Sequence, residues 1–251
     1  MKTEWWKNFY DEHLAHMLLH PATGEESQLT CDFLTKILNL SPGDHLFDQC
    51  CGTGRLAIEF AKRGYQITGI DLATSYIKEA QMMNQSGTEF SVADAFLYQT
   101  PEPCDAVINW WTSFGYSDDD AQNLKMLERA LASLKPGGCF AMDYMNVPNL
   151  YRKFLPLVTT TQEGKEGITT LHRESQIDFH QGQLHKTWNY ELPNGKTVKH
   201  ETSTKLYTPD QLVLFFKKVG FQDIQLHGNI DGSALSLESP RCIITGRNPM
   251  P

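Results

Sequence analysis

The stretch LFDQCCGTG, residues 46–54, is the most informative part of the chain. It begins as an apolar strand over 45–50, continues into a turn with two glycines, and precedes the helical apolar spacing of 55–63. Parallel α/β sheets bind ligands at such a unit, because glycines let a ligand approach the backbone at the carboxyl end of a strand. We therefore expect a cofactor cradle between Asp48 and Gly54.

Strands and helices alternate along both sides of this unit. Alternation at this spacing is typical of βαβ units, so the expected fold class is α/β with a mostly parallel, Rossmann-like sheet. The expected strands are 45–50, 66–70, 89–92, 106–109, 139–144, 221–227 and 242–245. The expected helices are 25–40, 55–63, 75–84, 121–134 and 209–220, and the segment 134–138 (LKPGG) is interpreted as a helix stop.

The pattern changes between residues 168 and 207, where alternating runs are separated by turn residues such as Asn194-Gly195. This predicts an inserted antiparallel sheet of about three strands that stands over the site as a lid. The expected division is an aromatic, helical N-terminal cap at 1–40, a core at 41–147 and 206–251, and a β lid at 148–205. The Trp5-Trp6 pair and Tyr10 lead us to expect that the cap closes over the cofactor.

The glycines alone do not identify the cofactor. Gly52-x-Gly54-x-x-Ala57, with Asp71 at the end of the second strand, also fits the NAD-binding fingerprint. Asp48, directly before the turn, would repel a pyrophosphate and suits a cationic ligand without phosphate. Asp71 can accept hydrogen bonds from ribose hydroxyls, and Asp94 can accept one from an adenine amino group.

At this point the chain resembles the class I S-adenosylmethionine-dependent methyltransferases. The resemblance rests on five motifs in order, which are Asp48-x-x-Cys51-Gly52-Thr53-Gly54, Asp71, Asp94-Ala95, the segment 104–109 (CDAVIN) and the segment 134–138 (LKPGG). It implies a seven-stranded sheet with an antiparallel last strand, S-adenosyl-L-methionine as cofactor and S-adenosyl-L-homocysteine as product. The implied cofactor-binding residues are Asp48, Cys50, Gly52, Gly54, Asp71, Leu72, Asp94, Ala95 and Asn109. The family often has glycine where this chain has Cys50, which we expect to narrow the site slightly.

The acceptor is expected beside the segment 110–116 (WWTSFGY), which follows the fourth strand. This segment and the β insertion resemble the small-molecule subgroup that includes sugar and glycine N-methyltransferases. The catalytic residue is unknown, with Tyr116, Tyr144 and His172 as candidates, and only one of His172 and Arg173 should point inward because neighbours on a strand alternate. The expected acceptor contacts are Trp110, Trp111, Ser113, Phe114, Tyr116, Tyr144 and Arg173.

Composition narrows the class of partner. The formal net charge of −8 disfavours nucleic acid, so the expected partner is a small-molecule methyl acceptor. The six cysteines form no C-x-x-C pair, so no metal site is expected. No targeting segment and no run of about 18 apolar residues is present, so a membrane partner is not expected and a cytoplasmic location is.

Several alternatives stay open from the sequence. The first alternative is methyl transfer to a nitrogen or oxygen atom, in which the protein mainly aligns the acceptor and removes its water. An NAD-dependent oxidoreductase and a non-catalytic S-adenosylmethionine-binding protein are the others. An RNA methyltransferase ranks lower, because Asn109-Trp110-Trp111-Thr112 stands where a base-handling Asn-Pro-Pro-Tyr segment would lie. The sequence predicts neither the acceptor nor the oligomeric state.

Overall fold

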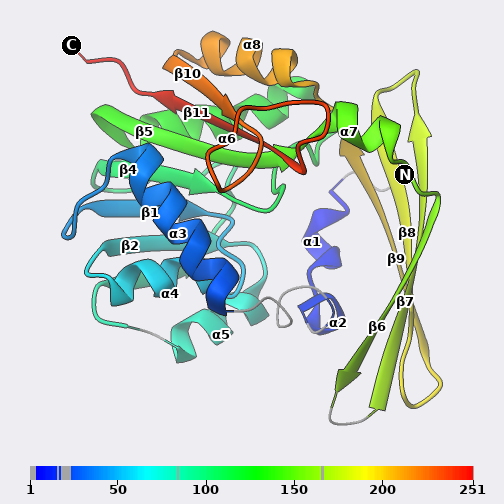
Figure 1. The fold of residues 1–251 in the computed structure, drawn as a ribbon. Helices are drawn as coiled ribbons and strands as arrows, with labels where there is room; N and C mark the ends of the chain where they lie inside the picture. Colours follow the sequence, from blue (N-terminus) through cyan, green and yellow to red (C-terminus); the bar gives the residue numbers. More distant parts are fainter. Residues whose placement is uncertain (1–3, 16, 18–23, 84, 165–166, 251) are drawn as a thin grey trace.

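The computed structural model describes residues 4–15, 17, 24–83, 85–164 and 167–250, and it confirms the expected α/β class. Seven strands form one sheet in the order β10-β11-β5-β4-β1-β2-β3 (Figure 1). Only β11 runs antiparallel to its neighbours, as expected for the last strand. The strand order reverses beside β1, which pairs in parallel with both β2 and β4. Ligand sites of open α/β sheets lie at such a reversal.

The core elements lie close to their expected positions. The sheet consists of β1 (His45–Gln49), β2 (Gln66–Asp71), β3 (Thr88–Val92), β4 (Cys104–Asn109), β5 (Leu134–Met145), β10 (Gln222–His227) and β11 (Arg241–Arg247). Its helices are α3 (Gly24–Leu38), α4 (Arg55–Lys62), α5 (Thr74–Met82), α6 (Asp120–Ala132), α7 (Val147–Arg152) and α8 (Pro209–Val219). The expected helix 75–84 extends to Asn84, which lies outside the described residues.

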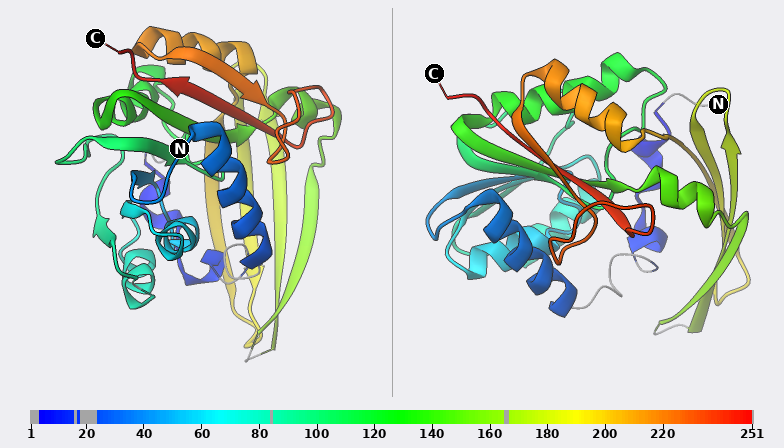
Figure 2. Two further views of the ribbon diagram at one scale, coloured as in Figure 1. Left: turned by 60° about the vertical axis from the view of Figure 1, so that its left-hand side comes forward. Right: turned by 45° about the horizontal axis from the view of Figure 1, so that its top comes forward.

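Two hydrophobic layers enclose the sheet. Helices α3, α4 and α5 bury their apolar sides in one layer, around Leu34, Leu56 and Phe60. Helices α6 and α8 do so in the other, around Leu127 and Phe216. Figure 2 shows the helices on both faces of the twisted sheet. Both faces are covered, as a parallel sheet requires, so the free edge for a ligand is the carboxyl end of the strands.

Helix α8 shows how local sequence sets an element. The Thr208 side chain accepts a hydrogen bond from the helix, and Gln211 accepts one from the Thr208 N–H at 2.9 Å. Pro209 occupies the first position, where no N–H is needed, and Gly220 ends the helix with φ 116°. These signals are local, so the expected helix was correct at both ends.

The segment 134–138 was interpreted mainly as a helix stop, with the strand expected only from Cys139, but it belongs to the strand. Helix α6 already ends at Ala132, and Leu134 starts strand β5. Leu134 pairs with Cys104 and Cys139 pairs with Ala106, so β5 carries extra residues between these two pairs and bulges there. Pairing with β4 therefore overrides the local preference of proline and glycine for a turn.

The lid is a separate antiparallel sheet of four strands in the order β6-β7-β8-β9, where about three had been expected. These strands are β6 (Leu157–Gly164), β7 (Gly167–Asp178), β8 (Gln183–Glu191) and β9 (Thr197–Lys205). The missed strand, β6, is mostly exposed and lacks a clear apolar alternation, but it pairs with β7 along its whole length. Its hydrogen bonds to β7, and not its own side chains, define it as a strand.

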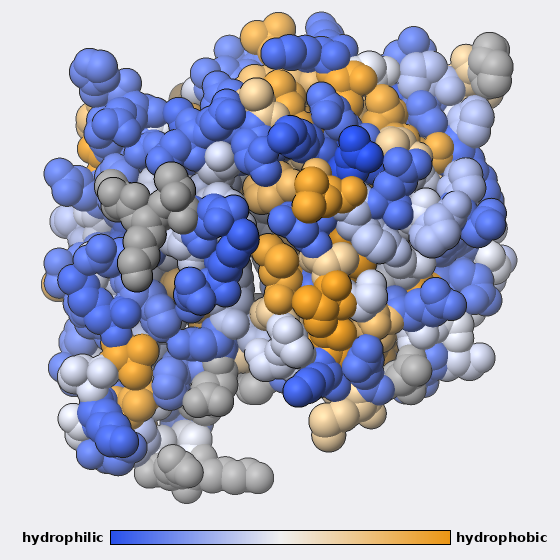
Figure 3. All heavy atoms as spheres, turned by 180° about the vertical axis from the view of Figure 1, so that it is seen from behind, coloured by the Kyte–Doolittle hydropathy of each residue, from blue (hydrophilic) through white to orange (hydrophobic). Residues whose placement is uncertain are grey.

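The N-terminal helices lie between the core and the lid. Helix α1 (Trp6–Phe9) and helix α2 (Glu12–Leu14) pack there in Figure 1. Phe9 and Leu14 share a small hydrophobic cluster with Trp188 and Tyr190 of the lid. Hydrophobic side chains also gather in the middle of the rear face, where lid and core meet (Figure 3). The division into cap, core and lid agrees with these layers but stays a prediction, and residues 1–3, 16 and 18–23 of the cap lie outside the described part.

Candidate functional site

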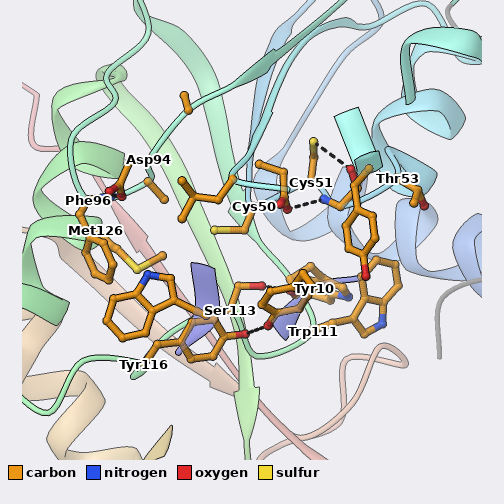
Figure 4. Close-up of a pocket in the computed structure, with 18 of the residues that line it drawn as sticks. Tyr10, Cys50, Cys51, Thr53, Asp94, Phe96, Trp111, Ser113, Tyr116 and Met126 are labelled. Atoms are coloured by element: carbon orange, nitrogen blue, oxygen red, sulfur yellow. Dashed lines mark hydrogen bonds between the residues drawn. The ribbon is translucent and has the colours of Figure 1, made fainter. Parts of the chain in front are cut away.

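A cavity opens at the carboxyl end of β1, β2 and β4, and Tyr10 of the N-terminal segment is among the side chains around it (Figure 4). Its volume is about 120 Å³, well below the roughly 300–1,000 Å³ of typical small-molecule sites. Ten residues expected in the site line it, namely Cys50, Gly52, Asp71, Leu72, Asp94, Ala95, Trp110, Trp111, Ser113 and Tyr116. Trp6 and Tyr10 of the N-terminal segment line it as well, which explains the small volume.

The two glycines of the turn, Gly52 and Gly54, have different structural roles. Gly52 has φ 57°, and a Cβ atom built there would meet nothing within 4 Å, so this backbone is open to a ligand. Gly54 has φ 79°, but its Cβ would lie 3.0 Å from Ala80 and 3.1 Å from Phe90. Gly54 therefore allows α4 to pack closely, and it does not line the cavity. Only Gly52 offers close backbone approach.

Cys50, the irregular residue of the turn, has φ 66°, a conformation that favours glycine. Its side chain lines the cavity, and burial raises the pKa of its thiol well above the ordinary value. The thiol is therefore neutral, and it supplies an apolar wall at the cost of backbone strain.

Asp71 closes the turn and faces the cavity. Its carboxylate oxygens accept hydrogen bonds from the Gly52 N–H and the Ala73 N–H, both at 2.9 Å. Burial raises the pKa of Asp71, and these backbone hydrogen bonds counteract the rise. Asp94, at the edge of the cavity, accepts a hydrogen bond from the Phe96 N–H at 2.9 Å. Each carboxylate is thus fixed by the backbone, with lone pairs left for a ligand.

Asp48 lies at the end of β1 and does not line the cavity. Its side chain is 3% exposed, and burial, reinforced by the negative charge of Asp71, raises the pKa of Asp48 to about 7. A nearby positive charge would favour its ionised form. Asn109 is also buried away from the cavity, where its amide donates to Gln49 at 3.0 Å while its Oδ1 atom has no partner.

The segment after β4 has an unusual backbone. Trp111 and Thr112 have φ 55° and 62°, although neither is glycine. The Trp111 N–H donates to the Asp143 carboxylate at 3.0 Å, and the Thr112 N–H donates to the Asp143 carbonyl at 3.0 Å. Arg241 pairs with Asp143 and also donates to the Thr112 hydroxyl at 2.8 Å. These hydrogen bonds and the ion pair hold Trp111 and Thr112 at positive φ, which residues other than glycine normally disfavour.

Two tyrosines meet in the cavity. Tyr116 donates its hydroxyl proton to the Thr112 carbonyl at 2.9 Å, so the hydroxyl of Tyr10, which is hydrogen-bonded to Tyr116, donates to Tyr116 (Figure 4). Burial raises the pKa of both phenols above the ordinary value. Both hydroxyls are therefore neutral near pH 7, and each keeps oxygen lone pairs that can accept from a ligand.

Four expected acceptor-side residues do not line the cavity. Phe114 and Tyr144 are fully buried in the core, where Tyr144 donates to the Lys205 carbonyl. His172 contacts Thr159 at 3.0 Å and lies 3.6 Å from Glu191, whereas its neighbour Arg173 faces Trp188 on the other side of the lid. The alternation along β7 was predicted, but which of the two residues faces inward depends on packing against α1.

Sequence reasoning missed several cavity residues. Arg55 lines the cavity with its guanidinium 4.0 Å from the centre of the Trp111 ring, and its Nη1 atom has no hydrogen-bond partner among the residues that the structure describes. Burial lowers the pKa of Arg55, although the group stays charged. Tyr76, Phe96 and Met126 add apolar walls. Their helical or loop positions carry no motif, so only the folded chain reveals them.

A second, larger cavity of about 780 Å³ adjoins the first, and Trp6 and Tyr116 line both. Helix α1, strand β9 and the loop after Tyr116 form its walls. Two buried polar atoms on its lining residues, Trp6 Nε1 and Ser203 Oγ, have no partner. Beside Tyr116 the structure thus combines an open space with lining residues whose polar atoms have no partner among the described residues.

The described residues contain no group of three or more metal-ligating side chains that could hold an ion. Among the described helices, none combines the length and the apolarity needed to cross a membrane.

The chain is similar to known proteins in both sequence and fold. Residues 46–138 match a family described as Methyltransferase domain. GWCH70_2453 of Geobacillus sp. (strain WCH70), named as a candidate methyltransferase, is 22% identical over 208 residues, covering 80% of this chain and 83% of that protein. The CcbJ methyltransferase of Streptomyces caelestis shares the fold, with a TM-score of 0.77 at 15% identity over 97% of this chain and 99% of that one. S-adenosylmethionine-bound CalS10, an amino pentose methyltransferase from Micromonospora echinaspora, also shares the fold. Its TM-score is 0.69 at 15% identity, over 91% of this chain and 93% of that one.

Proposed function

Since this chain is a class I S-adenosylmethionine-dependent methyltransferase, we propose that it methylates a nitrogen or oxygen atom of a small-molecule acceptor, releasing S-adenosyl-L-homocysteine. One observation carries the proposal. A single cavity joins the open glycine turn and the strand-end carboxylates of Asp71 and Asp94 to the aromatic segment after β4. The cradle therefore shares one space with groups that can hold an acceptor.

The residues fit the cofactor. Gly52 leaves room for close approach, Asp71 is fixed where ribose hydroxyls can donate to it, and Asp94 lies at the edge for the adenine. Cys50, Leu72 and Ala95 supply apolar contacts. Arg55, with its free Nη1 atom, suits the methionine carboxylate. Asp48 and Asn109 support the methionine part from beneath the turn.

When bound, the cofactor supplies an electrophilic methyl group on a positively charged sulfur. The protein's contribution is to align the acceptor and to exclude water. Trp111 and Ser113 line the acceptor side, and the Tyr10 and Tyr116 oxygens can accept a hydrogen bond from an acceptor N–H or O–H group. Because both phenols are neutral, no anionic base comes from them.

This chemistry favours an amine acceptor. A neutral amine needs no base before it attacks, whereas a hydroxyl usually does. The similarity in fold to an amino pentose methyltransferase agrees with a small amine in the small-molecule subgroup. The larger cavity beside Tyr116 provides space for the remainder of such an acceptor.

Access to the cradle requires motion of the N-terminal segment. The cavity of about 120 Å³ is smaller than a cofactor site, and Trp6 and Tyr10 are part of its wall. We infer that helix α1 and Tyr10 swing away to admit the cofactor and then close over it, as lids do in many enzymes.

Binding and transfer test the proposal separately. S-adenosyl-L-homocysteine should raise the melting temperature, and NADH should not. Asp71→Asn should weaken its binding by about 1–3 kcal/mol, as for a lost buried hydrogen-bonding partner. Asp105→Asn is the matched control, since Asp105 starts β4 at the opposite end of the sheet.

Incubation with methyl-labelled cofactor and a metabolite extract then tests catalysis. Transfer of label to a small molecule supports the proposal. Binding without any transfer would support the alternative, a non-catalytic S-adenosylmethionine-binding protein. Stabilisation by NADH alone would overturn both.

A further inference from the structure

The inner face of the lid carries two cations that lie against one tryptophan ring and, among the described residues, pair with no carboxylate. The Arg173 guanidinium lies 5.3 Å from the centre of the Trp188 ring, and the Lys186 ammonium lies 5.7 Å from it. Arg173 pairs directly with Trp188 across β7 and β8, and Lys186 is two residues before Trp188 on β8, so all three share one face. Among the described residues neither cation forms a hydrogen bond or an ion pair. Two like charges are thus held close together without a compensating anion.

A buried hydroxyl joins this cluster. Tyr190 follows Trp188 on the same face of β8 and is fully buried, and within the described part of the chain its hydroxyl has no hydrogen-bond partner. The Tyr190 hydroxyl and the Arg173 guanidinium are close enough to interact electrostatically. An unpaired buried hydroxyl and partly buried cations without an ion pair both destabilise a fold, so their presence together points to a ligand.

The cluster borders the larger cavity. Across β8 and β9, Lys186 is opposite Thr202 and Trp188 is opposite His200, and both Thr202 and His200 line that cavity. The Trp188 ring also contacts Phe9 of α1, another lining residue, with ring centres 5.1 Å apart. Arg173, Lys186 and Tyr190 line neither cavity themselves, but the β9 residues opposite Lys186 and Trp188 line the larger one, so the cluster lies one strand position away from that space.

The carboxylates around the larger cavity are already held. Asp118 accepts from Gln183 at 2.7 Å, and Asp119 accepts from the Ala121 N–H at 2.9 Å. Glu4 pairs with Lys7, and Glu201 pairs with Lys199. Asp11, near Tyr190, contacts His200 at 2.8 Å. None of these groups neutralises Arg173 or Lys186, so the positive charge of the cluster is available to a ligand.

We propose that Arg173, Lys186 and the Tyr190 hydroxyl bind an anionic group, a carboxylate or a phosphate, on the methyl acceptor. This inference rests on the proposed function and names a chemical class for its substrate. The planar guanidinium can bind two oxygens of such a group, and the ammonium and the phenol add single donors. Burial and the charge of Arg173 lower the pKa of Lys186 to about 8, and a bound anion would reverse that shift.

Anion titration at low ionic strength tests the site. Inorganic phosphate and acetate are the two probes, and they distinguish a phosphate from a carboxylate ligand. The wild-type protein should bind at least one of them, and Lys186→Met and Arg173→Gln should each weaken that binding at least ten-fold. Lys196→Met, in the exposed turn between β8 and β9, is the control and should bind as the wild type does.

Two further measurements keep the result interpretable. Lys186→Met should raise the melting temperature without ligand, because it removes a partly buried charge that lies close to the charge of Arg173, so a loss of anion binding cannot be ascribed to misfolding. All variants should still bind S-adenosyl-L-homocysteine, and failure of that binding in the wild type would count against the proposed function instead. Equal anion binding by wild type and both variants, or no anion binding at all, would overturn the site.

Discussion

The Arg241 guanidinium pairs with both carboxylate oxygens of the buried Asp143, and this ion pair holds the backbone of the segment beside the cavity. Asp143 is 2% exposed, and it accepts the Trp111 N–H at 3.0 Å while Arg241 donates to the Thr112 hydroxyl at 2.8 Å. Two residues with positive φ are thus fixed by one ion pair from strands β5 and β11. The last strand of the sheet therefore shapes the segment after β4 that lines the cavity.

Arg241→Met should lower the free energy of unfolding by about 3–5 kcal/mol, because it leaves a buried carboxylate without its partner. Urea denaturation followed by circular dichroism measures the change. The double variant Asp143→Asn/Arg241→Met should recover part of the loss, since an uncharged amide replaces the unpaired carboxylate. Arg247→Met, on the same strand, is the control and should cost clearly less. A loss below 1 kcal/mol for Arg241→Met would contradict the role of the pair.

Cys50→Gly should raise the free energy of unfolding by about 1 kcal/mol, because glycine adopts the observed φ of 66° without strain. Cys50→Ala is the matched control, since alanine loses the thiol but keeps the Cβ atom that causes the strain. The stability order expected by urea denaturation is therefore Gly above Cys and Ala. An alanine variant as stable as the glycine variant would show that the thiol, and not the backbone, is responsible.

Asp48 should make stability and cofactor binding depend on pH. Its pKa of about 7 in the fold exceeds the ordinary value of 3.8, so the folded state binds the proton more tightly than the unfolded chain. The resulting destabilisation is absent below pH 4, grows as the pH rises and is complete above pH 7. Asp48→Asn should therefore stabilise the cofactor-free protein at pH 8–9 by on the order of 2–4 kcal/mol, and the gain should vanish near pH 4.

The affinity for the cofactor should also depend on the ionisation of Asp48, and should increase with pH. A cationic ligand favours the ionised carboxylate, so S-adenosyl-L-methionine should bind more tightly as the pH rises through 7, and Asp48→Asn should flatten this dependence. Asp105→Asn is the control, because its effect on the free energy of unfolding should be opposite to that of Asp48→Asn. Burial would raise the pKa of Asp105, but hydrogen bonds from Lys135 and the His45 N–H outweigh it and lower that pKa. Asp105→Asn should hence destabilise the protein at neutral pH.

Tyr10→Ala should accelerate the association of S-adenosyl-L-homocysteine by on the order of 3–10-fold, because it removes a ring of the N-terminal segment from the wall of the cavity. Stopped-flow fluorescence of the cavity tryptophans measures the rate. Tyr10→Phe keeps the ring and removes only the hydroxyl, so its association rate should stay close to that of the wild type. Equal association rates for all three proteins would rule out closure by the N-terminal segment.

Much of the fold could be predicted because its signals are local. The alternation of strands and helices, the glycine turn and the cap of α8 each depend on residues close in the chain. Strand β6 and the first part of β5 could not be recognised in this way, because both are defined by pairing with another strand. For the site, the sequence predicts residues at strand ends, since parallel strands bring their carboxyl ends to one edge.

The sequence by itself determined the α/β class, the glycine turn and the carboxylates Asp71 and Asp94 at the edge of the sheet. Only the tertiary structure decided that Arg173 points inward and His172 outward, that Tyr144 is buried, and that Tyr10 meets Tyr116. The physical reason is that alternation along a strand places neighbouring side chains on opposite faces but does not say which face is buried. That depends on what packs against each face. Contacts such as Arg241 with Asp143, 98 residues apart, exist only once the strands have assembled.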